Sequence, residues 1–342
     1  MSWIGQFVQR ATPRWVTVAA GRARSGGRQR LAARQIGPVV NQVVPGATTH
    51  ELLVLRSDAA VVRVERHDDE PVILKLATSA GSVEFLDYQV AALEELAQLN
   101  SLGHWRRLVA TLEQRGTYDG GSWFTQSVIP GEPVTNVEVD PDALVAEAVR
   151  ALRPFHVATE STVMADESVL DDLVTKPIEM LRSWRPGLEG GLTAINGECR
   201  QRLASLELCL CRQHGAYVPS NILWDRDAGV VSGITDWRMP MQLLPAEVEY
   251  VHFALSLLAN RRRVDYGEAV ILMLNDGSGV VAGDPVEHAN ELGPNQFDVR
   301  TAVALTWLHH MSFDIHNRAE LRTNPIWLEK NIDSVVRVLD AK

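Results

Sequence analysis

The sequence predicts an α+β protein of two lobes. Two observations carry this prediction. Within the first 130 residues, strand-like apolar runs surround one long amphipathic run, which is typical of a small mixed β-sheet with a packed helix. Beyond Pro130-Gly131 the pattern changes to successive helical periods, typical of a mainly helical lobe. The predicted boundaries are 1–44 for an N-terminal extension, 45–130 for the first lobe and 131–342 for the second.

The first lobe is predicted to hold five strands. Turn signals at Ser57-Asp58 and Asp68-Asp69 separate the first three, which are rich in β-branched residues: HELLVLRS, AAVVRVERH and PVILKLA. A helix follows from about residue 81, because its apolar positions keep a spacing of three or four: Leu86, Val90, Leu93 and Leu96. Two further strands are predicted near RLVATLEQRGT and GSWFTQSVIPG.

The second lobe is predicted to begin with a helix. Asp140-Pro141 is a helix start signal, and the run DPDALVAEAVRALRPFHVA is amphipathic. Further helical patterns cover 166–184 and 196–213. A hairpin then follows in which NILW and VVSGITDW are strands and DRDAG is the turn, with Gly229 supplying a positive φ.

Composition limits the class of protein. No run reaches the roughly 18 apolar residues that span a bilayer, so we expect no membrane contact. The three cysteines, Cys199, Cys209 and Cys211, are too few for a disulfide framework, and we expect reduced core thiols and a cytoplasmic protein.

Charge is unevenly distributed along the chain. Seven arginines precede the first acid, Glu51, although the net charge of the whole chain is −10. We interpret this start as a solvated basic extension. The alternative is an arm that docks on an acidic surface of a protein partner or of this chain. Nucleic acid is not expected as a partner, because the rest of the chain is acidic.

The hairpin brings oxygen ligands together. Asn221 begins its first strand and Asp236 ends its second, so both are expected at one end of the ladder, where an amide oxygen and a carboxylate suit Mg²⁺. Lys75 closes the run VILK on a predicted core strand. A buried ammonium needs an anion, and nucleotide phosphate is the natural one.

The stretch HGAYVPSN and the hairpin after it resemble the aminoglycoside phosphotransferase family, whose members share the protein-kinase-like fold. The family's loop reads His-Gly-Asp, four residues, then Asn, and its metal strand ends Ile-Asp-Trp. The matching residues are His214, Gly215, Asn221, Ile234, Asp236 and Trp237, with Thr235 inserted. LPAEVEY, with Glu249, resembles a later Asp-Pro segment of the family, and RPFH, ending at His156, resembles the family's Leu-His helix terminus. The resemblance covers roughly residues 48–260.

The resemblance implies a phosphotransferase that moves the γ-phosphate of ATP or GTP, with Mg²⁺, to a hydroxyl of a small molecule such as an aminoglycoside. It assigns catalytic positions to His214, Ala216 and Asn221, and the metal to Asn221 and Asp236. It assigns nucleotide binding to Lys75, Glu84, Gln126 and Val128.

Three departures from the family pattern stand out. Ala216 replaces the aspartate that acts as the base. The family has a glutamate on this helix that pairs with the lysine, and its position here is Gln89, judged by the sequence distance to Leu93 and Leu96. Glu84 or Asp87 could serve instead. No glycine-rich loop joins the first two strands.

Because Lys75, Asn221 and Asp236 remain, we favour a working enzyme whose base was substituted over a natural pseudokinase scaffold. A second alternative is a Ser/Thr kinase of a precursor peptide in ribosomal-peptide (lanthipeptide-type) biosynthesis. The resemblance implies an acceptor site around residues 240–320. Acids in this range could suit a polyamine sugar, or could serve surface solubility alone: Glu247, Glu249, Asp265, Glu268, Asp284, Glu287, Glu291 and Asp298.

Overall fold

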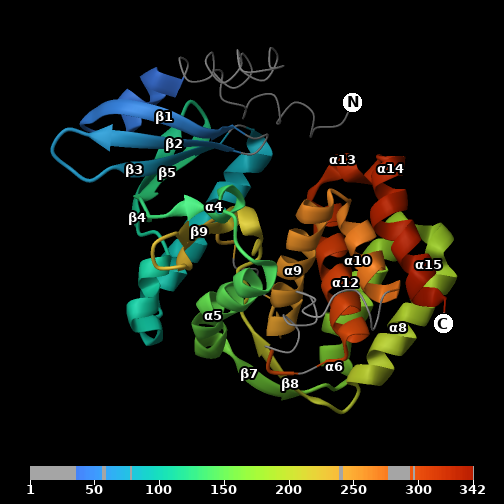
Figure 1. Cartoon of the computed structure of the whole chain (residues 1–342). Helices are drawn as coiled ribbons and strands as arrows, with labels where there is room; N and C mark the ends of the chain where they lie inside the picture. The colour runs from blue at the N-terminus through green and yellow to red at the C-terminus, as the bar shows by residue number, and fades with distance from the viewer. Residues whose placement is uncertain are drawn as a thin grey trace. The chain divides into compact units, whose positions relative to one another are not determined.

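The computed structural model describes residues 36–55, 59–77, 79–238, 242–275, 293–295 and 297–341 (Figure 1). They fall into two compact units. The first contains the described residues up to Gly131 and those from Ser232 to Arg238, and the second contains the remainder. The linear division predicted from the sequence does not include this return of 232–238 to the first unit. Among the described helices, none has the length and apolarity needed to cross a membrane.

The first unit is built on a five-stranded antiparallel sheet of order β1-β2-β3-β5-β4. The five strands predicted from apolar runs are confirmed. The prediction near 107–117 began too early, because Asn100–Leu108 forms a 3₁₀ segment, η1, before the strand. The strands are β1 (Ala47–Leu55), β2 (Ala59–Arg66), β3 (Val72–Ala77), β4 (Leu112–Tyr118) and β5 (Gly121–Ser127).

One helix, α4 (Ala80–Gln98), packs on β3 and β5. The Ser79 side chain caps it by accepting a hydrogen bond of 3.2 Å from the Ser82 N–H. All four predicted core positions of this helix, Leu86, Val90, Leu93 and Leu96, are buried. The predicted helix is therefore confirmed together with its apolar face.

A second helical segment, residues 36–43, packs on β1, β2 and β3. Its buried residues Ile36, Val39, Val40 and Val43 follow the three-to-four spacing of an amphipathic helix. Side chains alternate along a strand, so Leu74 and Leu76 face this helix while Lys75 faces the opposite side of the sheet. The predicted extension 1–44 therefore ends in part of the core, and its seven arginines lie outside the described residues.

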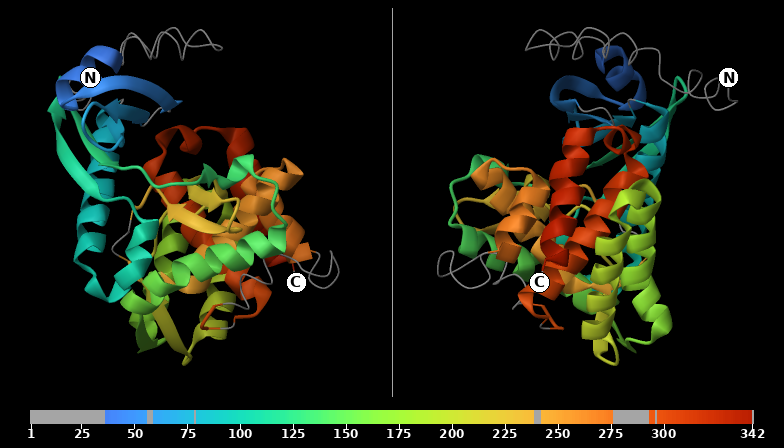
Figure 2. Two further views of the ribbon diagram at one scale, coloured as in Figure 1. Left: turned by 60° about the vertical axis from the view of Figure 1, so that its left-hand side comes forward. Right: turned by 90° about the vertical axis from the view of Figure 1, so that its right-hand side faces the viewer.

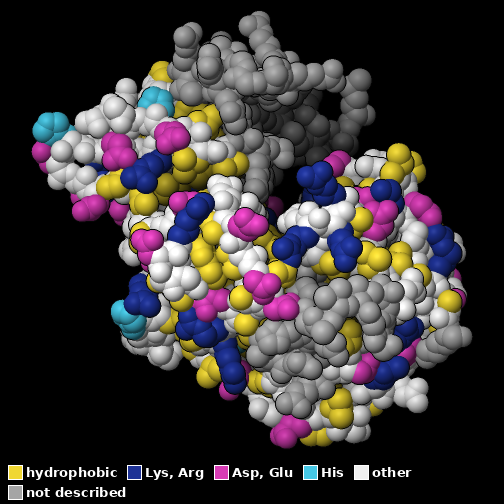
Figure 3. Space-filling model, in the orientation of Figure 1, with side chains coloured by type: hydrophobic (Ala, Val, Ile, Leu, Met, Phe, Trp, Pro, Cys, Tyr) yellow, Lys and Arg dark blue, Asp and Glu magenta, His cyan; other side chains and the backbone are white. Residues whose placement is uncertain are grey.

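The second unit is mainly helical, and α9 and α12 lie side by side within it (Figures 1 and 2). Its helices are α5 (Pro141–Thr159), α6 (Glu167–Leu170), α7 (Lys176–Trp184), α8 (Glu189–Leu203), α9 (Ala246–Arg262), α10 (Tyr266–Asn275), α12 (Val299–Asn317), α13 (Ala319–Arg322), α14 (Pro325–Leu328) and α15 (Ser334–Asp340). Asp171–Thr175 and Glu329–Asp333 are π-helical segments. Acidic and basic side chains occur together on the face of this unit drawn in Figure 3.

Short strands complete the second unit. Two small sheets have the orders β11-β8-β7 and β10-β9-β6. These strands are β6 (Glu132–Pro133), β7 (Ser161–Met164), β8 (Glu207–Cys211), β9 (Ile222–Asp225), β10 (Val230–Ile234) and β11 (Leu244–Pro245). The chain passes from the second unit to the first within β10.

The predicted hairpin is confirmed as β9 and β10, with Gly229 at φ +67° in the turn. Both strands are shorter than predicted, because Asn221 belongs to a 3₁₀ turn before β9 and Asp236 follows the end of β10. The predicted helix over 196–213 is wrong in its second half. Ser205 takes a left-handed φ of +64°, which ends α8 and reverses the chain, and the alternating run ELCLC forms β8. The three cysteines are free thiols, and Cys209 is half-buried rather than in the core.

Candidate functional site

A buried lysine is at the centre of the first unit's polar residues. Lys75 on β3 is 4% exposed. Its ammonium donates a hydrogen bond of 2.7 Å to Oε1 of Gln89 on α4, and it forms an ion pair with the carboxylate of Asp236. Burying an unpaired ammonium would be costly, so these two partners make the lysine's position possible.

The helix partner of Lys75 is Gln89 in the structure. Asp87 and Glu84 are exposed, and the Glu84 carboxylate accepts a hydrogen bond of 3.2 Å from the Tyr88 hydroxyl instead. The sequence had left these three residues open. The helical face that carries Leu86 and Leu93 turns Gln89 inward as well. The structure thus gives Lys75 a neutral helix partner and one carboxylate, that of Asp236.

The segment that carries Asp236 is held by aromatic packing. Asp236 has a left-handed φ of +63°, which is uncommon for a residue other than glycine and often marks a functional position. Trp237 after it is buried, and its indole N–H donates to the Ile234 carbonyl over 3.0 Å. Trp105 meets the Trp237 ring edge to face, with centroids 5.8 Å apart. These contacts fix the chain on both sides of the carboxylate.

The two predicted nucleotide contacts on β5 and after it lie apart. Gln126 lines a cavity of about 10 Å³ together with Gln89 and Asp236, which is about the space of one water molecule. Val128 lines a different cavity of about 920 Å³, between the end of α4 and the segment before β4. Gln126 therefore belongs to the polar group around Lys75, and Val128 does not.

In the second unit, the loop from His214 to Asn221 closes on itself through hydrogen bonds. The Ala216 N–H donates to Nδ1 of the buried His214 over 3.1 Å. The Ala216 carbonyl accepts a hydrogen bond of 2.8 Å from the side-chain amide of Asn221. Gly215, at φ +84°, makes the turn that these bonds require. The structure therefore joins the three predicted catalytic positions in one hydrogen-bonded loop.

Glu249 on α9 holds this loop in place through hydrogen bonds to its backbone. Its carboxylate accepts from the backbone N–H groups of His214 and Gly215, each at 2.8 Å. Nε2 of His156 on α5 lies 3.1 Å from the same carboxylate and donates to it. Burial acts to raise the pKa of Glu249, but the hydrogen bond and charge of His156 and the His214 N–H outweigh it, so the pKa is lowered.

Sequence reasoning identified Glu249 and His156 only as echoes of family positions. The signal available was an acid at the start of a helix and a histidine at the end of another. The contact of Glu249 with a loop 35 residues away, and that of His156 with Glu249 over 93 residues, could not be found without the fold.

The donor atoms suit a hard metal ion. The amide NH₂ of Asn221 donates to the Ala216 carbonyl, its side-chain oxygen accepts from the Ser220 hydroxyl over 3.4 Å, and Asp236 carries a carboxylate, and such oxygen atoms are the ligands that Mg²⁺ prefers. Asn221 belongs to the second unit and Asp236 to the first. Their approach to one ion stays a prediction. Within the described ranges, no cluster of three or more His, Cys, Asp or Glu residues could hold a metal by itself.

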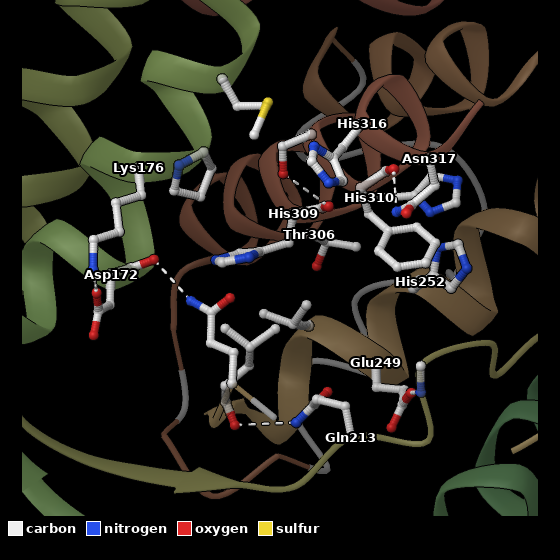
Figure 4. Close-up of a pocket in the computed structure, with 18 residues that line it drawn as sticks. Asp172, Lys176, Gln213, Glu249, His252, Thr306, His309, His310, His316 and Asn317 are labelled. Atoms are coloured by element: carbon white, nitrogen blue, oxygen red, sulfur yellow. Dashed lines mark hydrogen bonds and ion pairs between the residues drawn. The ribbon is translucent and has the colours of Figure 1, made fainter. Parts of the chain in front are cut away.

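A cavity of about 640 Å³ lies in the second unit next to the loop, with Gly215 and Glu249 on its wall (Figure 4). Its other walls are formed by α7, α9 and α12. The volume is in the range of pockets that hold a drug-sized molecule. The cavity therefore places room for a small molecule beside the position of Ala216.

The acids predicted to line an acceptor site mostly lie elsewhere. Glu249 is on the cavity wall. The carboxylate of Glu247 binds Asn295, those of Asp265 and Glu268 pair with Lys330, and Asp298 caps α12. Asp284, Glu287 and Glu291 lie outside the described residues. Each of the described acids has a structural task.

Comparison with known proteins gives the family and the fold of the chain. The model of the phosphotransferase enzyme family (APH) matches residues 51–247, more than half of the chain. The fold is similar to that of the gentamicin–APH(2'')-IIa complex, with a TM-score of 0.50, 10% identity, and coverage of 89% of this chain and 95% of that one. At this identity the likeness shows the fold alone, which is the protein-kinase-like fold.

Two further solved structures are similar at a TM-score of 0.49. One is the macrolide 2'-phosphotransferase MphH from Brachybacterium faecium, with 12% identity and coverage of 89% of this chain and 97% of that one. The other is a putative fructosamine-3-kinase from Thermobifida fusca, with 13% identity and coverage of 89% and 96%. No curated protein matches the chain at a significant level.

Proposed function

Because the chain belongs to the phosphotransferase enzyme family, we propose that it binds ATP or GTP with Mg²⁺ and carries the machinery that transfers the γ-phosphate to a hydroxyl of a small molecule. The observation that carries this proposal is Lys75, which is buried, charged and paired with Asp236. A buried ion pair is weak support for stability, since an apolar pair would often serve as well, so its presence on a core strand favours a functional role.

The residues of this chain divide the task. Lys75 would hold phosphate oxygens of the nucleotide, and Asp236 and Asn221 would hold the metal. Mg²⁺ supplies neutralisation of the charge on the transferred group. Gln89 keeps the ammonium in place by its amide oxygen. Glu249, through the His214 and Gly215 N–H groups, keeps the loop rigid.

Ala216 limits the rate in this chain. A base at this position would accept the proton of the acceptor hydroxyl, and general-base catalysis contributes about 10²–10⁴-fold. Within the loop from His214 to Asn221 there is no carboxylate to replace it. Nucleotide binding should survive, since Lys75, Asp236 and Asn221 all remain. The three free thiols suit a reducing compartment, so the proposal places the protein in the cytoplasm.

Binding of nucleotide is tested by calorimetry with Mg-ATP and Mg-GTP on the full chain. We expect binding of at least one of them, and loss of that binding in Lys75→Met and in Asp236→Asn. Lys330→Met is the matched control, because Lys330 is half-exposed and pairs with Asp265 and Glu268 away from the site. If neither nucleotide binds, or if Lys75→Met binds as well as the unaltered chain, the proposal is wrong.

Transfer is tested with Ala216→Asp. This substitution should raise the rate of phosphoryl transfer by about 10²–10⁴-fold with little change in nucleotide affinity. The acceptor panel includes aminoglycosides, uncharged glycosides and Ser/Thr peptides. A gain with peptides alone would assign the protein to peptide maturation. Intact nucleotide binding with no gain for any acceptor would identify a pseudokinase scaffold.

A further inference from the structure

The charges on the wall of the 640 Å³ cavity bear on which acceptor it can hold. Two carboxylates line it among the described residues, those of Asp172 and Glu249. Asp172 forms an ion pair with Lys176 one turn further along the chain (Figure 4). The side chain of Glu249 is 5% exposed and is occupied by His156 and two backbone N–H groups. Neither carboxylate is left without a cationic or N–H partner.

A polycationic acceptor needs several such carboxylates. Each ammonium that enters a pocket loses water, and the loss is compensated when a carboxylate or an array of acceptors meets it. Here an entering ammonium would have to displace Lys176 from Asp172 or compete with the hydrogen bonds that hold the catalytic loop. In both exchanges, the free energy lost with the broken interaction offsets part of the free energy gained from the new contact.

Rings form much of the remaining wall. His252, His310 and Phe313 all line the cavity, and the rings of His252 and His310 lie with centroids 4.2 Å apart. His309 donates through Nε2 to the Leu173 carbonyl over 2.9 Å, and burial lowers its pKa to about 4. Its ring is therefore uncharged at neutral pH. Such a wall favours a ligand with a planar or apolar portion.

Two buried polar atoms on the wall are unsatisfied. The Thr306 hydroxyl and Oε1 of Gln213 have no hydrogen-bond partner among the described residues, and both side chains are at least nine-tenths buried. Buried polar groups are nearly always hydrogen-bonded. A hydroxyl-bearing ligand offers a donor to the Gln213 oxygen and either a donor or an acceptor to Thr306.

We propose that this cavity accepts an uncharged hydroxyl-bearing molecule with a planar or apolar portion, and that it discriminates against polycationic aminoglycosides. This inference rests on the proposed phosphotransferase function, whose acceptor site it describes. It changes the expectation of a polyamine sugar, because the acids near the cavity are engaged in holding the protein together.

The test is a calorimetric titration of the full chain with a matched pair of probes. Phenyl β-D-glucopyranoside is uncharged, and phenyl 2-amino-2-deoxy-β-D-glucopyranoside has the same shape with one ammonium. Kanamycin serves as the polycation. We expect the uncharged glycoside to bind at least about tenfold more tightly than its amino counterpart, which corresponds to about 1.4 kcal/mol. Kanamycin should be the weakest of the three.

Variants locate the binding. Thr306→Val removes the hydroxyl at nearly constant volume and should weaken the uncharged probe by about threefold to tenfold, since one hydrogen bond contributes about that much. Thr323→Val is the control, because Thr323 is exposed and bonds within its own turn. The double substitution His316→Asp with Asn317→Asp adds two carboxylates to the cavity wall, and should raise kanamycin affinity by about tenfold or more.

Kanamycin binding to the unaltered chain as tightly as the uncharged glycoside would overturn the inference. Absence of binding by the uncharged glycoside would overturn it as well. Titration with Mg-nucleotide is run separately on the same protein. If the nucleotide fails to bind while the glycoside preference is observed, the phosphotransferase proposal fails and the cavity's selectivity stands. If the nucleotide binds and kanamycin binds more tightly than the uncharged glycoside, the inference about the cavity fails and the phosphotransferase proposal stands.

Discussion

Replacing Glu249 by glutamine should release the catalytic loop. The two carboxylate oxygens accept three donors: the His214 N–H and His156 Nε2 at one oxygen, and the Gly215 N–H at the other. Glutamine has one oxygen and one NH₂. Whichever way the amide is oriented, at least one backbone N–H of the loop faces an NH₂ group and loses its acceptor. His156 can change tautomer, but a backbone N–H cannot.

The magnitude follows from that count. A hydrogen bond to a charged group contributes about 1.5–3 kcal/mol, and an unsatisfied buried donor costs about 1–3 kcal/mol. The two magnitudes overlap, because both describe the same lost hydrogen bond. We therefore expect Glu249→Gln to lower the free energy of unfolding by about 2–4 kcal/mol. Glu179→Gln is the matched control. It breaks an ion pair with Arg182 in which the Glu179 side chain is 55% exposed, and should cost under about 1 kcal/mol.

The assay is hydrogen exchange of the backbone amides in the loop, read beside urea unfolding. Protection of the His214 and Gly215 amides should fall by about 30-fold or more in Glu249→Gln, while amides of β2 and β3 change little. In the Ala216→Asp background the same substitution should lower phosphoryl transfer more than nucleotide affinity. Unchanged loop protection would refute the view that Glu249 holds the loop.

Further predictions follow from single residues. Because the pKa of Glu249 is lowered, its stabilising contribution is present above its ordinary pKa of 4.5 and is lost as pH falls through the lower folded value. Below pH 4.5 the free energy of unfolding should therefore depend less on pH in Glu249→Gln than in the unaltered chain. His309 has its pKa lowered from 6.5 to about 4, so the unfolded chain takes up its proton first and stability should fall between these pH values by at most about 3 kcal/mol, a slope that His309→Gln removes. Gly215→Ala forces a left-handed φ of +84° on alanine and should cost about 1–2 kcal/mol, whereas Gly197→Ala in α8, with open space around the new Cβ, should stabilise by up to about 1 kcal/mol in the same unfolding assay.

Local patterns were sufficient to predict the sheet and α4. Period-two runs bounded by turn signals set the five strands, and the spacing of Leu86, Val90, Leu93 and Leu96 set the buried face of the helix. The helical segment 36–43 carries an equally readable spacing. It was missed because the arginines before it dominated the interpretation of the whole N-terminal stretch.

The site was less predictable because its contacts are tertiary. From the sequence, the helix partner of Lys75 could be Gln89, Glu84 or Asp87. Only the packing of α4 against the sheet shows that Gln89 makes the contact. The lysine's carboxylate comes from Asp236, more than 150 residues away in sequence. Acids counted along 240–320 suggested an acidic pocket. Their hydrogen bonds, such as those of Glu247 to Asn295, engage them in the fold instead.

Two carboxylates of the family pattern are absent, one at Ala216 and one at Gln89, and their effects should separate. The amide oxygen of Gln89 still accepts from the Lys75 ammonium at 2.7 Å, and Asp236 still supplies a negative partner, so the lysine is already positioned. No group in the loop performs the task of the missing base. We therefore expect Ala216→Asp alone to give the gain of about 10²–10⁴-fold, and Gln89→Glu added to it to change the rate by less than about tenfold. The measurement is a double-substitution cycle of single-turnover phosphoryl transfer with the best acceptor of the panel. A gain that emerges only when both carboxylates are restored would mean that Lys75 is not held in place by Gln89, and that the two positions diverged together.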